Sequence, residues 1–299
     1  WSSPLMILKK PKEKGGGWRV VVDFRLVNNK TKNWVYEIPR VEEYLNSLGN
    51  SRYFSTLDAA KGYFQVPIRE KDKEITAFIV PGRGSYMFSK MPMGAKCSAQ
   101  TYQALMDMIL GPLKFEVALC YVDDVLVVGK TFEHHLNNLK LVFQAIKEAN
   151  ITLKPSKCVF AVPCIRFLGH IINAQGKFID GRKIKAVLDL PTPKNLKDIR
   201  SFVAFCSYYR SFISNFAKHA APLTKLTRND EEWRWNKEEQ EAFEDLKNKV
   251  IKATMLSHYN PKAETRVRTD ASGIGLGAAL TQRQINKKWA PIAFASRQL

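Results

Sequence analysis

Three aspartates stand where their carboxylates could do chemistry. Asp123 and Asp124 are adjacent in the otherwise apolar run 118–128, and Asp58 ends the strand-like segment 53–58. Two carboxylates about 4 Å apart repel each other by roughly 4 kcal/mol at an effective dielectric constant of about 20. A divalent cation between them would remove this repulsion. The alternative is a hairpin turn that directs both acids into solvent.

The third acid favours a metal site. If the strand ending at Asp58 lies beside the hairpin of Asp123, the three carboxylates meet at one point. Carboxylate oxygens are hard ligands that suit Mg²⁺ and Mn²⁺. Two such ions about 3.5–4 Å apart serve in-line phosphoryl transfer, one activating the attacking hydroxyl and the other holding the leaving group. The acids therefore predict two-metal phosphoryl transfer.

Alternating apolar residues predict the strands that position these acids. The strand-like runs are 5–9, 18–23, 53–58, the two halves of 117–129, and 267–270. The run 117–129 contains a predicted tight turn at Val122-Asp123. The Lys/Gly-rich tract 9–17 indicates a loop between the first two strands, either charged for a purpose or merely solvated.

Helical periodicity appears between and after these strands. The predicted helices are Ser98–Leu110, one that follows a Thr131 cap, Asn195–Ile213 and Lys237–Val250. For the helix after Thr131 the predicted apolar positions are Leu136, Leu139, Phe143 and Ile146. The helix Asn195–Ile213 is predicted to bury Leu196, Ile199, Phe202, Val203, Cys206, Tyr209 and Ile213, and to expose Lys197, Arg200 and Arg210. Beyond Gly169 we expect mainly helices.

Composition narrows the class of protein. The 299 residues suffice for two domains, and 45% hydrophobic with 25% charged residues is ordinary for a globular protein. The net charge of +19 attracts polyanions such as nucleic acid, although a basic surface kept for solubility is the alternative. Because no apolar run approaches the ~20 residues of a membrane span, we expect no membrane association.

The five cysteines carry no metal or disulfide pattern. They are scattered, odd in number and without C-x-x-C spacing, which argues against a disulfide framework and a zinc site. We expect them to be buried small hydrophobes in a reducing compartment. No signal peptide is recognisable, and the first residue is Trp1. We therefore expect the chain to be excised from a longer polyprotein.

A series of motifs resembles one family. Tyr121-Val122-Asp123-Asp124 resembles the signature hairpin of reverse transcriptases, and 57–65 resembles their first catalytic strand. Further similar segments follow in the family's order: Trp18–Asn28, Met91–Gly94, Leu153–Cys158, Phe167–His170, Leu196–Phe202, Tyr208–Arg210, Ala221–Leu223 and Thr269–Gly273. The chain is identified as a member of this family, similar to the gypsy-type enzymes of LTR retrotransposons.

The resemblance implies an α+β fold of the right-hand polymerase type. Fingers and palm would occupy residues 1–170 and the thumb or connection helices 171–230. The N-terminal part of an RNase H-like α/β domain would occupy 231–299. Only Asp270 of that domain's four acids is visible, and the chain ends at Leu299. We therefore expect no RNA cleavage by this chain.

The resemblance also implies roles for single residues. Asp58 and Asp123, helped by the Ala59 carbonyl, would ligate two Mg²⁺ ions, with Mn²⁺ as a substitute, and Asp124 would be a looser ligand. Residues implied in the nucleotide pocket are Arg19, Tyr63, Met93 and a lysine of the tract 9–14. Tyr63 would be the steric gate against ribose, with ordinary packing as its alternative role. Phe167, Leu168 and Gly169 would belong to the primer grip.

The sequence departs from the family around the segment before the palm helix. Met93 stands where retroviral enzymes carry Gln and gypsy relatives Phe, so we expect altered nucleotide selection. Ala95–Ala99 replaces the usual Leu-x-Asn-Ala-Pro, which could shift the start of the helix. Lys96 has no evident role in the sequence.

The implied function is RNA-directed DNA synthesis on a primer–template duplex with dNTPs. The rest of the Pol polyprotein, with protease, RNase H and integrase, would be the protein partner. The chain would be located in the cytoplasm, within a virus-like particle, with a later nuclear phase. Two alternatives remain open. One is a catalytically silent or domesticated nucleic-acid-binding relic. The other is an RNA-dependent RNA polymerase, against which Tyr63 and the segment of Asp270 argue.

Overall fold

The computed structural model describes residues 2–10, 16–228, 231–273 and 275–299. The chain forms two compact units. The first unit comprises Trp1–Tyr44 and Phe54–Val162, and the second comprises Leu45–Tyr53 and Pro163–Leu299. The division predicted at residues 170 and 230 stays a prediction. Trp1 and residues 11–15 of the lysine-rich tract lie outside the described residues.

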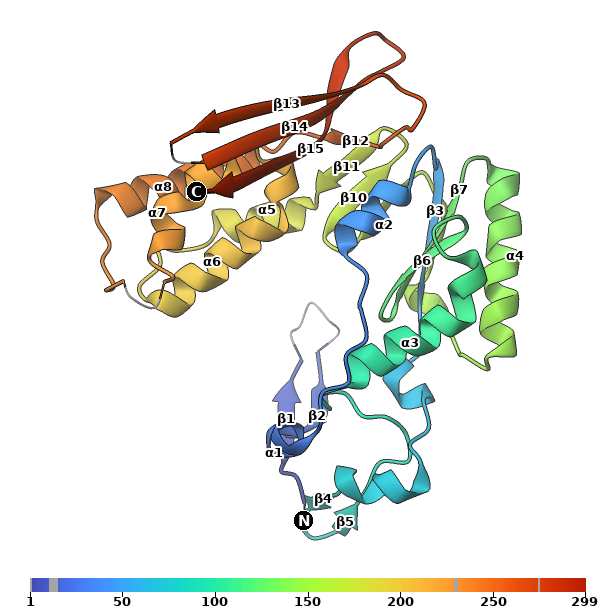
Figure 1. The fold of residues 1–299 in the computed structure, drawn as a ribbon. Coiled ribbons are helices and arrows are strands. Elements are labelled where there is room, and N and C mark those ends of the chain that lie inside the picture. Colours follow the sequence, from blue (N-terminus) through green and yellow to red (C-terminus); the bar gives the residue numbers. More distant parts are fainter. Residues whose placement is uncertain (1, 11–15, 229–230, 274) are drawn as a thin grey trace. The chain divides into compact units, whose positions relative to one another are not determined.

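A four-stranded sheet forms the centre of the first unit (Figure 1). Its strands are β3 (Tyr53–Asp58), β6 (Ala118–Tyr121), β7 (Asp124–Gly129) and β8 (Val159–Val162), in the order β6-β7-β3-β8. β6 and β7 form the antiparallel hairpin expected in 117–129, and β3 occupies the predicted residues. The sequence therefore placed the three strands that carry the acids correctly.

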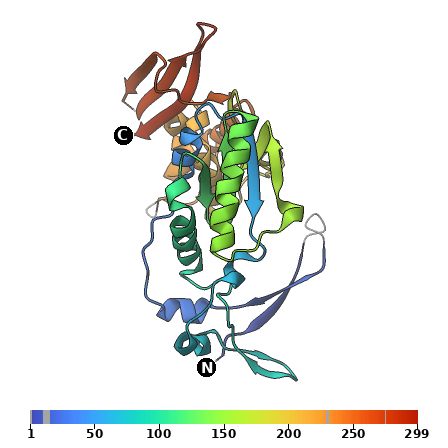
Figure 2. The ribbon, with the colours of Figure 1, turned by 90° about the vertical axis from the view of Figure 1, so that its right-hand side faces the viewer.

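Two helices cover one face of this sheet, α3 (Ser98–Leu110) and α4 (Phe132–Glu148) (Figure 2). Both were predicted, and the Thr131 side chain caps α4 by accepting a hydrogen bond from the His134 backbone N–H. Helix α3 stops at Leu110 as predicted, but a 3₁₀ turn, Gly111–Leu113, continues from it.

The buried face of α4 differs from the prediction. Leu139 and Ile146 are buried, but Leu136 and Phe143 are 41% and 38% exposed. Polar residues pack against the sheet instead, because the sheet offers them hydrogen-bond partners. Asn138 Nδ2 donates to the Val128 carbonyl at 2.7 Å, and His135 Nε2 lies 2.7 Å from Ser55 Oγ. Hydrophobic periodicity cannot foresee such pairs.

The remaining elements of the first unit form smaller pieces around the sheet. β1 (Leu5–Lys9) pairs antiparallel with β2 (Trp18–Val22), as predicted. The others are α1 (Arg25–Lys30), α2 (Val41–Ser47, which crosses into the second unit), and the hairpin of β4 (Phe78–Val80) and β5 (Gly84–Tyr86).

The part of the second unit that follows Pro163 begins with strands rather than with helices. β9 (Cys164–Phe167), β10 (His170–Asn173), β11 (Gly176–Ile179) and β12 (Leu256–Ser257) form a sheet in the order β12-β11-β10-β9. The expectation of mainly helices after Gly169 was therefore wrong for 170–179, and also for 275–283 and 289–298, which form strands. β10 and β11 are only four residues long, too short for alternation to stand out.

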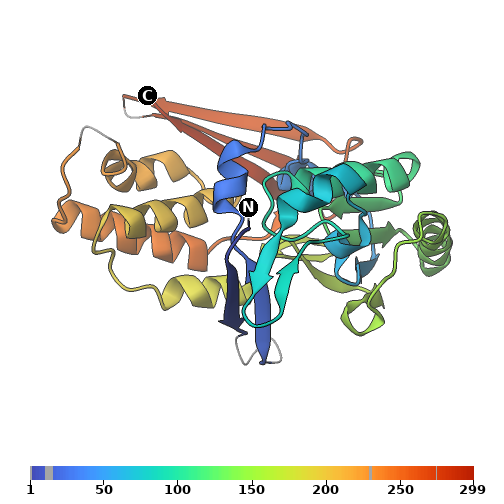
Figure 3. The same cartoon turned by 90° about the horizontal axis from the view of Figure 1, so that it is seen from below.

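Helices follow and gather into one bundle (Figure 3). They are α5 (Gly181–Leu188), α6 (Leu196–Tyr208), α7 (Phe216–Lys225) and α8 (Lys237–Ile251). The prediction of one helix to Ile213 was too long, since α6 ends at Tyr208 and a 3₁₀ turn, Arg210–Phe212, follows. Its predicted apolar face is confirmed: Ile199, Phe202, Cys206, Tyr209 and Ile213 are buried, and Leu196 and Val203 pack beside them.

The last described element is a three-stranded antiparallel sheet. Its strands are β13 (Thr265–Ser272), β14 (Gly275–Arg283) and β15 (Trp289–Gln298), in that order.

Among the cysteines only Cys120 and Cys206 are buried, while Cys164 is exposed, so the expectation of uniform burial was wrong. No described helix combines the length and apolarity of a membrane span.

Candidate active site

Two of the predicted acids leave the central sheet on the same face. Asp58 is the last residue of β3, and Asp124 is the first residue of the neighbouring β7. Their neighbours Leu57 and Val125 are buried in the core that α3 and α4 share with the sheet. Because successive side chains of a strand point to opposite faces, Asp58 and Asp124 lie on the face away from these helices.

The acids share one electrostatic environment. Partial burial raises the pKa of the Asp124 carboxyl, and the negative charges of Asp123 and Asp58 raise it further. Asp124 is exposed as a residue, but the surrounding protein still desolvates its carboxyl. Asp123 adjoins Asp124 in the chain and Asp58 ends the strand next to β7, so both charges act on Asp124, and the positive charge of Lys157 opposes them.

A lysine lies against one of these acids. Lys157 ends the 3₁₀ turn Pro155–Lys157, and its Nζ is 2.9 Å from Asp58 Oδ2. The two side chains are 56% and 26% exposed, so the ion pair contributes at most about 1 kcal/mol. No three His, Cys, Asp or Glu side chains in the described part of the chain surround a common ion position. The metal-ligand set stays a prediction.

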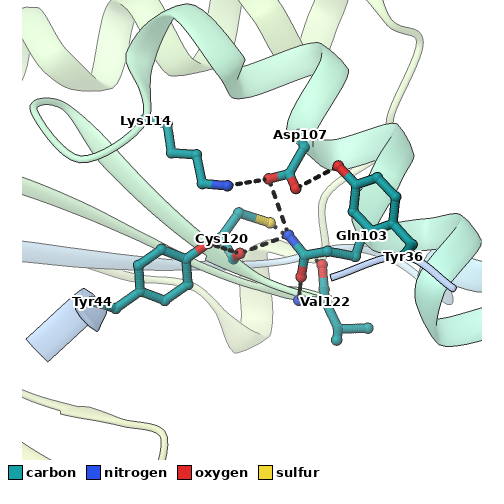
Figure 4. Close-up of polar contacts among 7 residues, drawn as sticks. All are labelled: Tyr36, Tyr44, Gln103, Asp107, Lys114, Cys120 and Val122. Atoms are coloured by element: carbon teal, nitrogen blue, oxygen red, sulfur yellow. Dashed lines mark hydrogen bonds and ion pairs between the residues drawn. The ribbon is translucent and has the colours of Figure 1, made fainter. Parts of the chain in front are cut away.

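The turn that carries Asp123 is fastened to α3 by a buried glutamine (Figure 4). Val122 has φ = 55°, and its N–H donates to Gln103 Oε1 at 2.7 Å. Gln103 Nε2 donates to the Cys120 carbonyl at 3.0 Å. The sequence analysis missed Gln103. The sequence feature that could have indicated it is a polar amide side chain on the apolar face of a helix, between Tyr102 and Met106.

Tyr63 packs against α3, and the charge of Asp123 acts on it. Its ring centroid is 5.3 Å from that of Tyr102, and Gly62 permits this approach, since a Cβ there would lie 2.8 Å from the Tyr102 hydroxyl. Burial raises the pKa of Tyr63, and the charge of Asp123 raises it further. The ring therefore packs as the alternative role requires and also lies near the turn.

The Ala59 backbone is held in place by the segment opposite. Ala59 forms an isolated β-bridge with Leu153. The flanking hydrogen bonds use the Asp58 carbonyl, which accepts from Lys154, and the Ala60 amide, which donates to Thr152. Neither of these bonds uses the Ala59 carbonyl that is predicted to assist a metal ion.

The structure brings together two of the predicted pocket residues, Arg19 and Met93. A guanidinium nitrogen of Arg19, on β2, lies 2.6 Å from the Met93 sulfur. The segment after Met93 is tied to α1 by Asn28, whose side chain donates to the Gly94 carbonyl and accepts from the Lys96 N–H.

Lys96 gains a role in this arrangement. Its Nζ donates to the Thr31 carbonyl at 3.0 Å, and Thr31 is the C-cap of α1. A cation favours the negative end of a helix dipole, although one as short as α1 gives a small effect. Helix α3 begins at Ser98, where it was predicted to begin. A shift of this start relative to the family stays a prediction.

Comparison with known proteins now identifies the family. A sequence model described as "Reverse transcriptase (RNA-dependent DNA polymerase)" matches residues 8–172, more than half of the chain. The chain belongs to the reverse transcriptase family. A second model, "RNase H-like domain found in reverse transcriptase", matches residues 235–299. Members of this family generally use divalent metal ions.

Relatives of the chain are retrotransposon polyproteins. The Pol polyprotein from transposon 412 of Drosophila melanogaster is 36% identical over 300 residues, which cover 99% of this chain and 24% of that protein. The Pol polyprotein from transposon 297 of the same organism is 36% identical, with 100% and 28% covered. The transposon Tf2-3 polyprotein of Schizosaccharomyces pombe is 30% identical, with 99% and 22% covered. The chain thus spans about a quarter of these relatives. Its gypsy class stays a prediction.

Solved structures of a reverse transcriptase confirm the predicted fold. The foamy viral protease-reverse transcriptase in complex with dsDNA aligns with a TM-score of 0.83 at 24% identity, over 100% of this chain and 61% of that one. The same protein in complex with an RNA/DNA hybrid gives 0.80 at 24% identity, over 100% and 39%. The fold is therefore the α+β right-hand polymerase fold followed by the start of an RNase H-like domain.

The predicted primer-grip residues of this family member lie in the second unit. Phe167 is buried at the end of β9, and Leu168 and Gly169 form the turn to β10 with φ = 45° and 76°. The carbonyl of Leu168 accepts from the Tyr208 hydroxyl at 2.7 Å, and that of Gly169 from the Tyr209 hydroxyl at 3.1 Å. Two tyrosines at the end of α6 therefore hold this turn.

Asp270, the predicted first acid of the RNase H-like domain, lies on β13. This strand is exposed along its whole length and stands at an edge of the described sheet. Asp270 pairs with Gly277 of β14. It belongs to the second unit, whereas Asp58, Asp123 and Asp124 belong to the first.

Proposed function

We propose that this chain is the RNA-directed DNA polymerase of a retrotransposon Pol polyprotein. It would extend a primer by nucleotidyl transfer from dNTPs on an RNA or DNA template. The observation that carries the proposal is the placement of Asp58 and Asp124 on one face of the central sheet, next to the turn of Asp123. Membership of the family supplies the reaction.

The proposed ligands are of the chemical type that a divalent cation takes. Carboxylates of Asp58 and Asp123 with the Ala59 carbonyl are hard oxygen ligands, and Asp124 adds a looser one. The pKa of Asp124 is raised first by burial and then by the negative charges of Asp123 and Asp58, and a bound cation would offset those charges. When bound, a pair of Mg²⁺ or Mn²⁺ ions would favour ionisation of the primer 3′-hydroxyl and stabilise charge on the leaving pyrophosphate.

Other residues of the first unit would bind the nucleotide. The exposed guanidinium of Arg19 can form paired hydrogen bonds to phosphate while the Met93 side chain packs against it. Tyr63 would crowd a ribose 2′-hydroxyl and so favour deoxynucleotides. A lysine of the tract 9–14, of which Lys9 and Lys10 are described, would contact the triphosphate.

Nucleic acid would be the principal partner. The foamy viral enzyme was solved with an RNA/DNA hybrid and with dsDNA, and the +19 charge of this chain suits the same ligands. The rest of the Pol polyprotein would supply protease, RNase H and integrase functions. Assembly in cytoplasmic virus-like particles, with a later nuclear phase, completes the proposal.

Primer extension tests this function. The chain is given oligo(dT) on poly(rA), Mg²⁺ or Mn²⁺, and dTTP or UTP in separate reactions. Incorporation of dTTP in strong preference to UTP is expected. Equal use of UTP would indicate an RNA polymerase. Absence of incorporation, together with tight binding of the duplex, would indicate a silent relic.

A further inference from the structure

The turn of the catalytic hairpin has a conformation that its own sequence disfavours. Tyr121 pairs with Asp124, so Val122 and Asp123 form a two-residue turn. Val122 has φ = 55°, in the left-handed region, where a β-branched side chain clashes with its own backbone. Tight hairpin turns favour Gly, Asn or Asp at such a position. Contacts from outside the turn must therefore hold it.

Gln103 supplies the contact that acts on the strained residue itself. Its side chain is fully buried, and its Oε1 accepts the Val122 N–H at 2.7 Å. Its Nε2 donates to the Cys120 carbonyl at 3.0 Å. One amide thus bridges the residue in the turn and the strand two residues before it (Figure 4).

The surroundings fix the direction of this amide. Asp107, one helical turn further along α3, accepts from Gln103 Nε2 at 3.2 Å. The same carboxylate accepts from Lys114 Nζ at 3.0 Å and from the Tyr36 hydroxyl at 2.9 Å. With acceptors on one side and the Val122 N–H on the other, only one orientation of the amide satisfies every group.

The strand end next to the turn is fixed in a second way. The Cys120 carbonyl also accepts from the Tyr44 hydroxyl at 2.8 Å, and the Cys120 thiol donates to the Val122 carbonyl at 3.4 Å. The backbone immediately before Asp123 is therefore held on several sides, and Gln103 is the group that joins it to α3.

We propose that Gln103 is a positioning residue of the polymerase site. By holding the Val122 backbone in its left-handed conformation, it sets the direction in which the Asp123 and Asp124 carboxylates leave the hairpin. The hydrogen bonds of Gln103 in the described structure go to Val122, Cys120 and Asp107, so it acts on the two carboxylates only through the backbone of the turn. The inference rests on the proposed function for its consequence in catalysis, but its structural part can be measured separately.

The first test uses Gln103→Met, which keeps the length of the side chain and removes its hydrogen bonds. In primer extension kcat should fall about 100-fold, as small misplacements of catalytic groups do, while KM for dTTP stays within about twofold because nucleotide contacts remain. Gln144→Met on α4 is the matched control, since that exposed amide bonds only to Glu148 in the described structure. Its kcat should not change.

Rescue distinguishes positioning from packing. Glycine adopts a positive φ without help, so adding Val122→Gly to Gln103→Met should recover kcat about tenfold, a difference of about 1.4 kcal/mol in the barrier. Packing lost at Gln103 could not be restored from the turn. A double variant no faster than Gln103→Met would overturn the proposal, as would a Gln103→Met enzyme with unchanged kcat.

A second readout does not depend on activity. Amide hydrogen exchange, followed by NMR on the unmodified chain and on Gln103→Met, should show a protected Val122 N–H that exchanges at least about tenfold faster in the variant. Rapid exchange in the unmodified chain would overturn the proposal even if the variant failed to fold. If the chain does not polymerise at all, the proposed function fails, and the exchange measurement still decides whether Gln103 holds the turn.

Discussion

At the scale of single residues, the face of the sheet on which a carboxylate lies determines whether it can share a metal site with other carboxylates. Asp58 and Asp124 lie on the same face because their buried neighbours, Leu57 and Val125, both point toward the helices. One residue of slip in either strand would move its acid to the opposite face. The packing of two apolar side chains thus controls the geometry of the proposed metal site.

Lys157 should compete with a metal ion for Asp58. Its ammonium lies 2.9 Å from the carboxylate, so a cation that binds there must displace it. Removing the lysine in Lys157→Met should tighten Mn²⁺ binding about two- to fivefold, as expected for a partly exposed ion pair. Mn²⁺ titration followed by electron paramagnetic resonance measures this. Lys73→Met, which breaks a remote pair with Glu70, is the control. Unchanged or weaker Mn²⁺ binding in Lys157→Met would contradict the competition.

Tyr63 should restrict the sugar of the incoming nucleotide. In Tyr63→Val the smaller side chain leaves room for a 2′-hydroxyl, so the ratio of kcat/KM for dTTP over UTP should fall at least about tenfold, roughly 1.4 kcal/mol of discrimination. Phe64→Leu is the control, because that ring packs toward Phe88. A ratio that does not change in Tyr63→Val would leave packing against Tyr102 as the role of this residue.

At the scale of elements, the turn between β9 and β10 depends on a buried histidine as well as on α6. The ring of His170 is stacked on Phe212, 5.5 Å between centroids, and its Nδ1–H donates to the Leu168 carbonyl at 2.8 Å. Burial lowers the pKa of His170 to about 4, the Leu168 hydrogen bond opposes this shift, and the Lys177 charge adds to it. The neutral ring is therefore part of the folded second unit.

Acid should destabilise this unit through His170. Below its ordinary pKa of 6.5 the unfolded chain takes up a proton, whereas the folded chain resists protonation down to a pKa of about 4. The free energy of unfolding should thus fall as the pH drops from 6.5 to 4, by at most about 2 kcal/mol between pH 7.5 and 5. Urea titrations at both pH values should show a smaller loss in His170→Gln. The exposed His134→Gln is the control. An equal loss in His170→Gln would contradict this assignment.

The sequence predicted elements better than it predicted their buried polar contacts. Alternation and capping placed β3, the β6–β7 hairpin, α3 and α4, since each obeys a local rule. Gln103 was missed because its role depends on a hydrogen bond to the Val122 backbone N–H, and only the fold places that N–H beside it. The same is true of Asn138 and His135, which replaced two apolar residues on the predicted face of α4.

At the candidate site, too, residue types were predicted from the sequence, whereas contacts between distant residues were not. The three acids were singled out by their types and by the family resemblance. The structure places Asp58 and Asp124 at the ends of neighbouring strands, beside the turn of Asp123, and their use as metal ligands stays a prediction. Lys157 lies within the motif Leu153–Cys158, but nothing in its local sequence indicates a contact with Asp58, a residue 99 positions away. Contacts between residues so far apart in the sequence can be recognised only when the fold is known.

At the scale of the whole molecule, the net charge of +19 should determine how nucleic acid is held. If lysines and arginines neutralise duplex phosphates, binding releases counterions and weakens with salt. The dissociation constant for a primer–template duplex should rise at least about 100-fold between about 50 and 200 mM NaCl. Fluorescence anisotropy measures this, with a methylphosphonate duplex as the uncharged control. A shallow salt dependence for the natural duplex would contradict phosphate neutralisation as the source of affinity.

The most direct test of the central claim is primer extension by Asp123→Asn beside the unmodified chain. The substitution keeps the shape of the side chain and removes the charge that would bind a metal ion. The proposed mechanism predicts that dTTP incorporation on oligo(dT)/poly(rA) falls at least about 1000-fold, about 4 kcal/mol of transition-state stabilisation. Asp189→Asn, at the exposed C-cap of α5, should keep full activity. An Asp123→Asn chain that still extends the primer at a comparable rate would contradict the assignment of the active site.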